Sequence, residues 1–157
     1  MISEKYLYEW EETIPTRIRV PGVYTLQHLK QFLEDPKEGL PTIGIPVVYE
    51  TDQIKSGGVF NKQLTDCLII RNQQHMYDYF CFVLIARNVG NFTGIEIWRY
   101  GTSALSYKQN KKEERKSSSS LFQNIVGGLT KTDSQGLEAE YMYYDLVADV
   151  LKKIFGI

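Results

Sequence analysis

Cysteine and histidine are scarce in this sequence, with two of each among its 157 residues. Cys67 and Cys81 are not spaced as a CxxC pair, which structural zinc sites commonly include among their four ligands. A zinc site that adds His75, or a disulfide between the two cysteines, remains an alternative to two buried small side chains. We expect no metal and no cofactor, because a chain of this length can bury an adequate core without either.

Long hydrophobic runs are also lacking. No stretch approaches the ~18 consecutive apolar residues that span a bilayer, and the longest run, residues 79–86, has the length of a strand. The first six residues do not resemble a secretory signal peptide, which begins with basic residues followed by an apolar run. These absences predict a cytoplasmic protein without a membrane partner.

Positive charge is not in excess. The formal net charge is -1 and the pI is near 6.1, so the field of the whole molecule would not attract phosphate backbones. The one dense basic run, residues 108–116, is interrupted by Glu113 and Glu114 and leads into four serines, as a solvated linker does. We therefore do not expect nucleic acid as a partner.

Catalytic motifs are absent from the sequence. Gly57-Gly58 and Gly127-Gly128 lack the GxxxxGKS/T and GxGxxG spacings of phosphate-binding loops. A cysteine–histidine nucleophilic pair is disfavoured, because His75 falls at a predicted turn, away from thiols held along strands. One enzymatic alternative stays open, a small metal-dependent hydrolase or phosphodiesterase that uses carboxylates on or beside predicted strands: Glu50, Asp52, Asp66 and Glu96.

Three neighbouring segments rich in β-branched and aromatic residues predict strands, at 66–71, 77–87 and 93–100. Gly90-Asn91 suits a two-residue hairpin turn between the last two, since both residues tolerate positive φ. Residues 72–76 suit a five-residue loop between the first two. The sequence therefore predicts an antiparallel meander over residues 66–100, and further strands at 16–20 and 47–49 bring the sheet to four or five strands.

Two helices are predicted, one on each side of the meander in the sequence. Six apolar residues advance by 4, 3, 4, 3 and 4 positions and predict a long C-terminal helix over 135–155 with a wide apolar face. Thr25 is a suitable N-cap for a short helix over 25–35, which Pro36 ends. Residues 109–132 are polar and repetitive and predict a mobile or disordered loop. The whole is a single α+β domain over residues 1–157, an antiparallel sheet of four to five strands packed by both helices.

The predicted turns also set which side chains share a face of the meander. A turn centred on Gln74 places Cys67 opposite Cys81, and the second turn places Val83 opposite Trp98. One face is then almost entirely apolar and is expected to pack under the C-terminal helix. It contains Leu68, Ile70, Phe80, Phe82, Leu84, Ile95 and Ile97, with Arg99 as its one charge.

The second face is aromatic, with charged edges, and has the composition of binding hot spots: Arg71, Tyr77, Tyr79, Trp98 and Tyr100. Intramolecular cover by the 25–35 helix or by a loop is an alternative of equal weight. Our hypothesis from the sequence is a non-enzymatic binding or interaction protein that uses this face. Its partner would be another protein or a second copy of the chain, which makes a homodimer a natural possibility.

Overall fold

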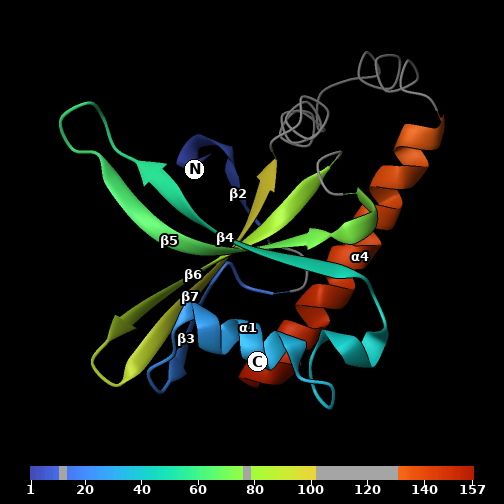
Figure 1. Cartoon of the computed structure of the whole chain (residues 1–157), viewed down its shortest axis with the longest axis horizontal. Coiled ribbons are helices and arrows are strands. Elements are labelled where there is room, and N and C mark those ends of the chain that lie inside the picture. Colours follow the sequence, from blue (N-terminus) through green and yellow to red (C-terminus); the bar gives the residue numbers. More distant parts are fainter. Residues whose placement is uncertain (11–13, 76–78, 102–130) are drawn as a thin grey trace.

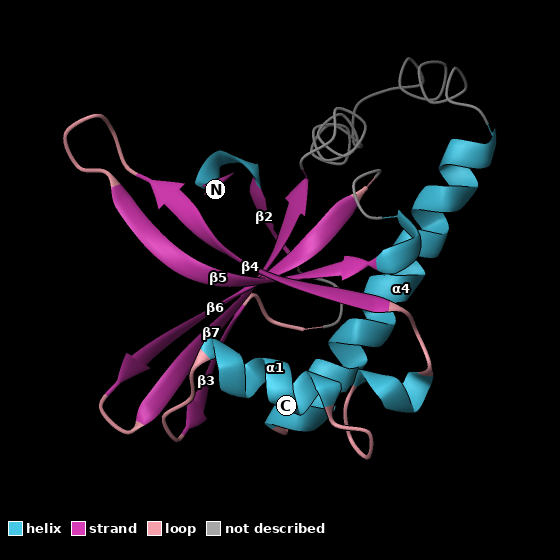
Figure 2. Ribbon diagram, viewed as in Figure 1, coloured by secondary structure: helices cyan, strands magenta, loops and turns pink. Residues whose placement is uncertain are grey.

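The computed structural model describes residues 1–10, 14–75, 79–101 and 131–157, which form an α+β fold (Figure 1). Both helices pack against one face of a single sheet, so the fold class predicted from the sequence is confirmed (Figure 2). The helices are α1 (Leu26–Glu34) and α4 (Lys131–Phe155), and the 3-10 turns are η1 (Glu4–Tyr6), η2 (Leu40–Ile43) and η3 (Gln73–His75). The strands are β1 (Ile2–Ser3), β2 (Leu7–Glu9), β3 (Arg17–Pro21), β4 (Val47–Ser56), β5 (Gln63–Asn72), β6 (Phe80–Val89) and β7 (Phe92–Gly101).

The strands of the described residues form one mixed, mostly antiparallel sheet. Its order is β1-β4-β5-β6-β7-β2, and β3 pairs with β7 beside β2. The predicted meander is present as β4 to β7, in which each strand pairs antiparallel with the next. β1 pairs parallel with β4. The sheet has more strands than predicted because the first nine residues contribute a short strand to each of its edges.

These first residues, 2–9, form a strap between the two edges of the sheet. Ile2 pairs with Ile54 on β4, and Leu7 pairs with Tyr100 on β7. The four steps from Ser3 to Leu7 span at most about 14 Å, whereas five strand spacings would set β1 and β2 about 24 Å apart in a flat sheet. The sheet must therefore curl, and it forms a half-barrel with the strap across one face.

The face opposite the strap, here called the helix face, holds the larger core. All seven apolar residues predicted for this face are buried in it. Tyr144, Val147, Ala148 and Leu151 of α4 complete the same core, and the rings of Tyr144 and Phe82 lie 4.7 Å apart. The predicted packing of the C-terminal helix is confirmed. In the described ranges, no helix has the length and hydrophobicity to cross a bilayer.

The helix boundaries are close to those predicted. The hydroxyl of Thr25 accepts a hydrogen bond from the His28 N–H at 3.2 Å, and the His28 ring nitrogen Nδ1 accepts one from the Thr25 N–H at 3.1 Å, which caps α1 as expected. α4 ends at Phe155 as predicted but begins at Lys131, four residues before the predicted start at residue 135. Of the predicted loop over 109–132, residues 109–130 lie outside the described residues, and residues 131–132 belong to α4.

Arg99, the charged residue predicted on the helix face, is enclosed by aromatic rings. Its guanidinium lies 5.7 to 6.0 Å from the ring centroids of Tyr8, Phe80 and Tyr141. It also donates a hydrogen bond from Nη1 to the Tyr141 hydroxyl at 2.8 Å. Cation–π attraction and this hydrogen bond offset the cost of burying the charge.

Trp10 closes the helix-face core at the point where the chain leaves β2. Its side chain is 1% exposed, and its ring lies 5.0 Å from Phe82, 5.8 Å from Phe80 and 6.0 Å from Tyr141. It joins the sheet to α4 through contacts between residues far apart in the sequence. Periodicity gave no signal for this role, because Trp10 lies beyond the end of a three-residue strand.

The face under the strap, here called the strap face, holds a second and smaller core. Its buried residues are Ile2, Ile54, Cys67, Ile69, Cys81, Val83, Ile85 and Tyr100, against which Tyr6, Leu7 and Trp98 pack. Both cysteines have free thiols and are buried, in agreement with their interpretation as small core side chains. The strap therefore supplies the intramolecular cover that the sequence analysis assigned to a helix or a loop.

The register of β5 on β6 differs from the prediction by four residues. Ile69 pairs with Val83, so the prediction that Cys67 lies opposite Cys81 is wrong. β5 continues through Asn72, and η3 then lengthens the connection, which moves the pairing along β6. Four is an even number, so the paired side chains keep their predicted faces despite the error.

The register of β6 on β7 is as predicted. Val83 pairs with Trp98, and a two-residue turn at Gly90-Asn91 joins the strands. Gly90 has a φ of 58°, whereas Asn91 does not take a positive φ. Only the first turn residue therefore needs the left-handed region, as in a type II′ turn.

β4 is longer than predicted. It covers Val47–Ser56, although the sequence indicated a strand over 47–49 and a loop over 52–58. Its second half is mostly polar and exposed, with Ile54 as its buried residue. Pairing with β5 along all ten residues, and with β1 at the far end, overrides the weak local preference for a strand.

Replacing Trp10 with alanine should lower the free energy of unfolding by about 3 to 5 kcal/mol, the usual cost of deleting a fully buried large aromatic side chain. Trp98→Ala is the matched control, because Trp98 is only partly buried, and we expect it to cost less than half as much. Urea denaturation followed by circular dichroism measures both. Equal losses for the two variants would contradict the assignment of Trp10 to the core.

Stability should fall at alkaline pH. Burial raises the pKa of the Cys67 and Cys81 thiols from 9.0 to about 12, and it raises the pKa of the Tyr144 hydroxyl well above its ordinary value. The folded state therefore keeps protons that the unfolded state releases, so this contribution is complete below pH 9 and is lost between pH 9 and pH 12. Urea denaturation at a series of pH values tests this. The Cys67→Ala, Cys81→Ala double variant should show a shallower decline, and an equally steep one would contradict the assignment to the thiols.

Candidate functional site

The five residues predicted to form a binding face do not share one open surface. Tyr100 and Arg71 lie on the strap face but are each only 6% exposed. Tyr79 is buried in the helix-face core, and Tyr77 lies outside the described residues. Trp98, which is partly buried at the rim of the strap face, is the most accessible of the four that the structure describes.

The four carboxylates of the hydrolase alternative do not converge. Glu50 accepts a hydrogen bond from Nε of the buried Arg71 at 3.3 Å, which pairs its charge. The β4–β5 ladder sets Gln53 beside Asp66, so Asp66 and Asp52 point to opposite faces of the sheet. Among the described residues, no group of three or more histidine, cysteine, aspartate or glutamate side chains is placed to hold a metal ion.

The most unusual feature of the sheet is a fork between β5 and β6. These ten-residue strands pair at only three positions, Leu68 to Ile70 on β5. In the same register, Asp66 would meet Ala86 and Leu64 would meet Asn88, but the strands diverge before this point (Figure 2). Beyond this point the β4–β5 hairpin runs beside β1, which pairs with β4, whereas the β6–β7 hairpin runs beside β3, which pairs with β7.

The residues that would have completed the ladder instead line cavities on both faces of the sheet. On the helix face, a cavity of about 540 Å³ is lined by residues 64–66 of β5, residues 86–88 of β6, and residues 24–27 at the start of α1. On the strap face, a cavity of about 460 Å³ is lined by Arg17, Ile54, Ile85 and Trp98, among others. Thr65 and Arg87 line both cavities, so the fork is accessible from both faces.

Hydrogen bonding elsewhere in the sheet shows which backbone groups face the fork. Ile97 of β7 donates its N–H to the carbonyl of Thr16 at 2.8 Å, on the side away from β6. Successive residues of an antiparallel strand turn their backbone N–H and C=O groups to opposite sides. Even-numbered residues of β6 therefore turn these groups toward β5, and even-numbered residues of β5 turn theirs toward β6. The backbone groups of Leu64, Asp66, Ala86 and Asn88 therefore point into the fork.

The backbone groups at the two ends of the β5–β6 pair differ in whether they have hydrogen-bond partners. At one end, where the pairing stops after Ile70, the hydroxyl of Tyr144 accepts a hydrogen bond from the Asn72 N–H and donates one to the Ile70 carbonyl, each at 3.3 Å. α4 thus satisfies the backbone where the ladder stops. At the fork end, no strand of the described part of the chain pairs with the free edges.

A charged network fixes Trp98 beside the fork. Glu96 accepts hydrogen bonds from Arg87 Nε at 2.8 Å and from Trp98 Nε1 at 3.2 Å. Arg17 lies over the Trp98 ring, 4.9 Å from its centroid, and its Nε is 3.8 Å from Glu96. The carboxylate is shielded, whereas more than half of each arginine side chain is exposed. The site therefore offers a fixed indole ring and two accessible guanidinium groups.

No protein-family model, curated protein or solved structure matches this chain significantly. The function has to be inferred from the site itself. Trp98 and Glu96 were singled out by the sequence analysis, whereas Arg17, Arg87 and the open strand edges were not. Their role depends on where β5 and β6 separate, and the residue pattern gave no signal for that point.

Amide hydrogen exchange should report the open edges directly. The N–H groups of Leu64, Asp66, Ala86 and Asn88 should exchange quickly, because no strand among the described residues bonds to them. Those of Leu68, Ile70, Phe82 and Leu84, which lie in the paired part, should be protected. Nuclear magnetic resonance resolves these amides individually. Slow exchange at the first four positions would mean that the fork is closed in solution.

Proposed function

We propose that this chain is a non-enzymatic binding protein that receives an extended segment of a partner protein in the fork between β5 and β6. The observation that carries the proposal is the pair of unpaired strand edges, at residues 63–67 and 85–89, between which cavities lie on both faces of the sheet. Unpaired strand edges bind extended peptides through main-chain hydrogen bonds. Four residues already turn their backbone groups in that direction.

Side chains of an added strand would alternate between two different environments. On the strap face they would meet Trp98, Ile85 and the exposed arginine side chains. On the helix face they would meet Tyr24 and Leu26. Backbone pairing would provide affinity that is independent of sequence, and these two groups of side chains would provide specificity.

Trp98 is the expected anchor of this interaction. Tryptophan and arginine are enriched among residues that dominate binding energy, and here Arg17 holds the indole ring in place from above. The proposal keeps the expectation that Trp98 serves binding and that the partner is a protein. The binding site is now the fork beside Trp98 and not an open aromatic face. The other aromatic residues of the predicted face are buried where the structure describes them.

The test is selection of extended peptides from a displayed library of random linear sequences, followed by calorimetry of the best binder. Ala86→Pro should weaken its binding about tenfold, because proline removes the N–H that faces the fork and leaves the β6–β7 bonds in place. Ala86→Val keeps that N–H and serves as the matched control, with affinity within about twofold of the original. Trp98→Ala should weaken binding by about tenfold as well.

Equal affinities for Ala86→Pro and Ala86→Val would contradict strand addition in the fork, as would a selection without any binder. The mass in solution, from light scattering, identifies the source of the segment. A monomer would place the segment in another protein. A dimer that Ala86→Pro dissociates and Ala86→Val does not would identify the partner as a second copy of the chain.

A further inference from the structure

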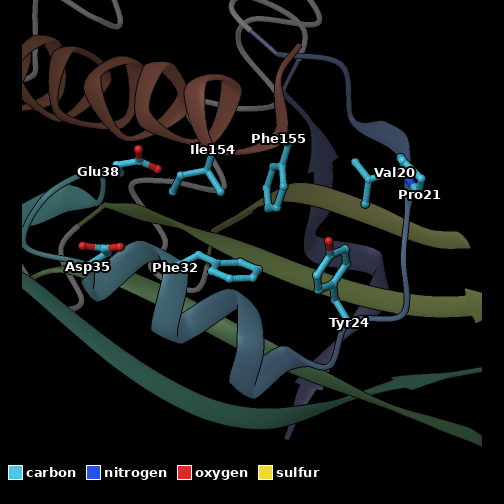
Figure 3. A pocket seen from close by; sticks show the side chains of 8 residues that line it. All are labelled: Val20, Pro21, Tyr24, Phe32, Asp35, Glu38, Ile154 and Phe155. Carbon is cyan, nitrogen blue, oxygen red and sulfur yellow. The ribbon is translucent and has the colours of Figure 1, made fainter.

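A third cavity, of about 330 Å³, lies where α1, the end of β3 and the end of α4 meet (Figure 3), and Tyr24 is the residue that it shares with the helix-face cavity of the fork. It is lined by Val20, Pro21, Tyr24, Phe32, Asp35, Glu38, Ile154 and Phe155. In Figure 3 Asp35 and Glu38 lie at the same end, Asp35 on the side of α1 and Glu38 on the side of α4, while the aromatic rings lie in the middle and Val20 and Pro21 at the other end. The cavity is therefore acidic at one end, and aromatic and aliphatic side chains line the rest of its length.

The apolar wall is held rigidly. Leu29 and Leu33 of α1 are buried in the helix-face core and fix the helix that carries Phe32. The rings of Tyr24 and Phe32 contact edge to face, with centroids 5.6 Å apart. Phe155 comes from the opposite end of the chain and lies across from Phe32 in Figure 3. The rings thus form a preorganised aromatic slot, with Phe32 partly open to solvent.

The polar end carries only negative charge. None of the eight lining residues is lysine, arginine or histidine. Asp35 accepts a hydrogen bond from the Lys37 backbone N–H at 2.8 Å, which orients its carboxylate. The nearby Lys30 is directed elsewhere, since its Nζ lies 3.8 Å from Glu34. Two carboxylates at the end of an aromatic slot are complementary to a positive charge on an apolar body.

We propose that this cavity binds a small amphipathic cation, an organic ammonium whose aromatic or aliphatic body lies between the rings. The ammonium group would lie at Asp35 and Glu38, and the body would displace water from Phe32, Phe155 and Ile154. The volume is in the range of small-molecule sites, and aromatic walls with a few convergent charged groups are typical of them. Attraction between the cation and the aromatic rings adds to the charge complementarity.

Three probes with the same body and different charge test this directly: 4-phenylbutylammonium, 4-phenylbutan-1-ol and 4-phenylbutyrate. Titrations followed by nuclear magnetic resonance give both the affinity and the residues that shift. The ammonium should bind about tenfold more tightly than the alcohol, and the carboxylate should be the weakest of the three. Shifts should be confined to the residues that line the cavity and their neighbours.

Variants connect the charge preference to the two carboxylates. The Asp35→Asn, Glu38→Gln double variant should reduce the affinity for the ammonium to that for the alcohol. Glu34→Gln is the matched control, because it removes the carboxylate of the last residue of α1, which does not line the cavity, and the preference should remain. Phe155→Ala should weaken the ammonium and the alcohol alike, because it removes part of the shared apolar wall.

Equal affinity for the ammonium and the alcohol would overturn the proposal, as would an unchanged preference in the double variant or no binding of any probe at millimolar concentration. The spectrum of each variant shows in the same experiment whether it is folded. Ala86→Pro, which alters the fork, should leave ammonium binding unchanged. Either binding proposal can therefore be contradicted without affecting the other.

Discussion

Ser3 and Leu7 are only four positions apart in the sequence, yet their strands pair with opposite edges of the sheet. Hydrogen bonding at both ends of this short strap is possible only if those edges approach each other. The sheet therefore curls, and one of its faces closes over Tyr6 and Leu7. The burial of both cysteines and of Tyr100 follows from this constraint rather than from any preference of the meander itself.

The fork lies between the two hairpins of the same curled sheet. The β4–β5 hairpin continues beside β1, while the β6–β7 hairpin continues beside β3, so the two hairpins separate where their outer partners differ. The free edges therefore belong to the two central strands of the sheet, where an edge is not normally found. The cost is small while water solvates the free backbone groups, and the same groups are then available to another chain.

Tyrosine hydroxyl groups satisfy polar backbone where the regular pairing stops. Tyr144 serves the end of β5 opposite the fork. Tyr143 donates a hydrogen bond to the Pro46 carbonyl at 2.7 Å, just before β4 begins. An apolar ring with a polar tip suits these places, because the ring fills the core while the hydroxyl reaches the strand ends. Tyr143 and Tyr144 of α4 thus have a structural role that is separate from the proposed binding site.

The α+β class, the meander, both helices and the apolar face under α4 could be predicted from the sequence, because they depend on periodicity and on turn residues such as Gly90. The sequence also indicated Trp98 as a residue to examine. It did not determine the register of β5 on β6, the length of β4 or the burial of Trp10, since each depends on pairing or contact between distant segments. The fork and the aromatic slot arise only in the folded chain. Both are spaces between elements, and their shape is set by where the strap draws the sheet edges and by where α1 and the end of α4 come together.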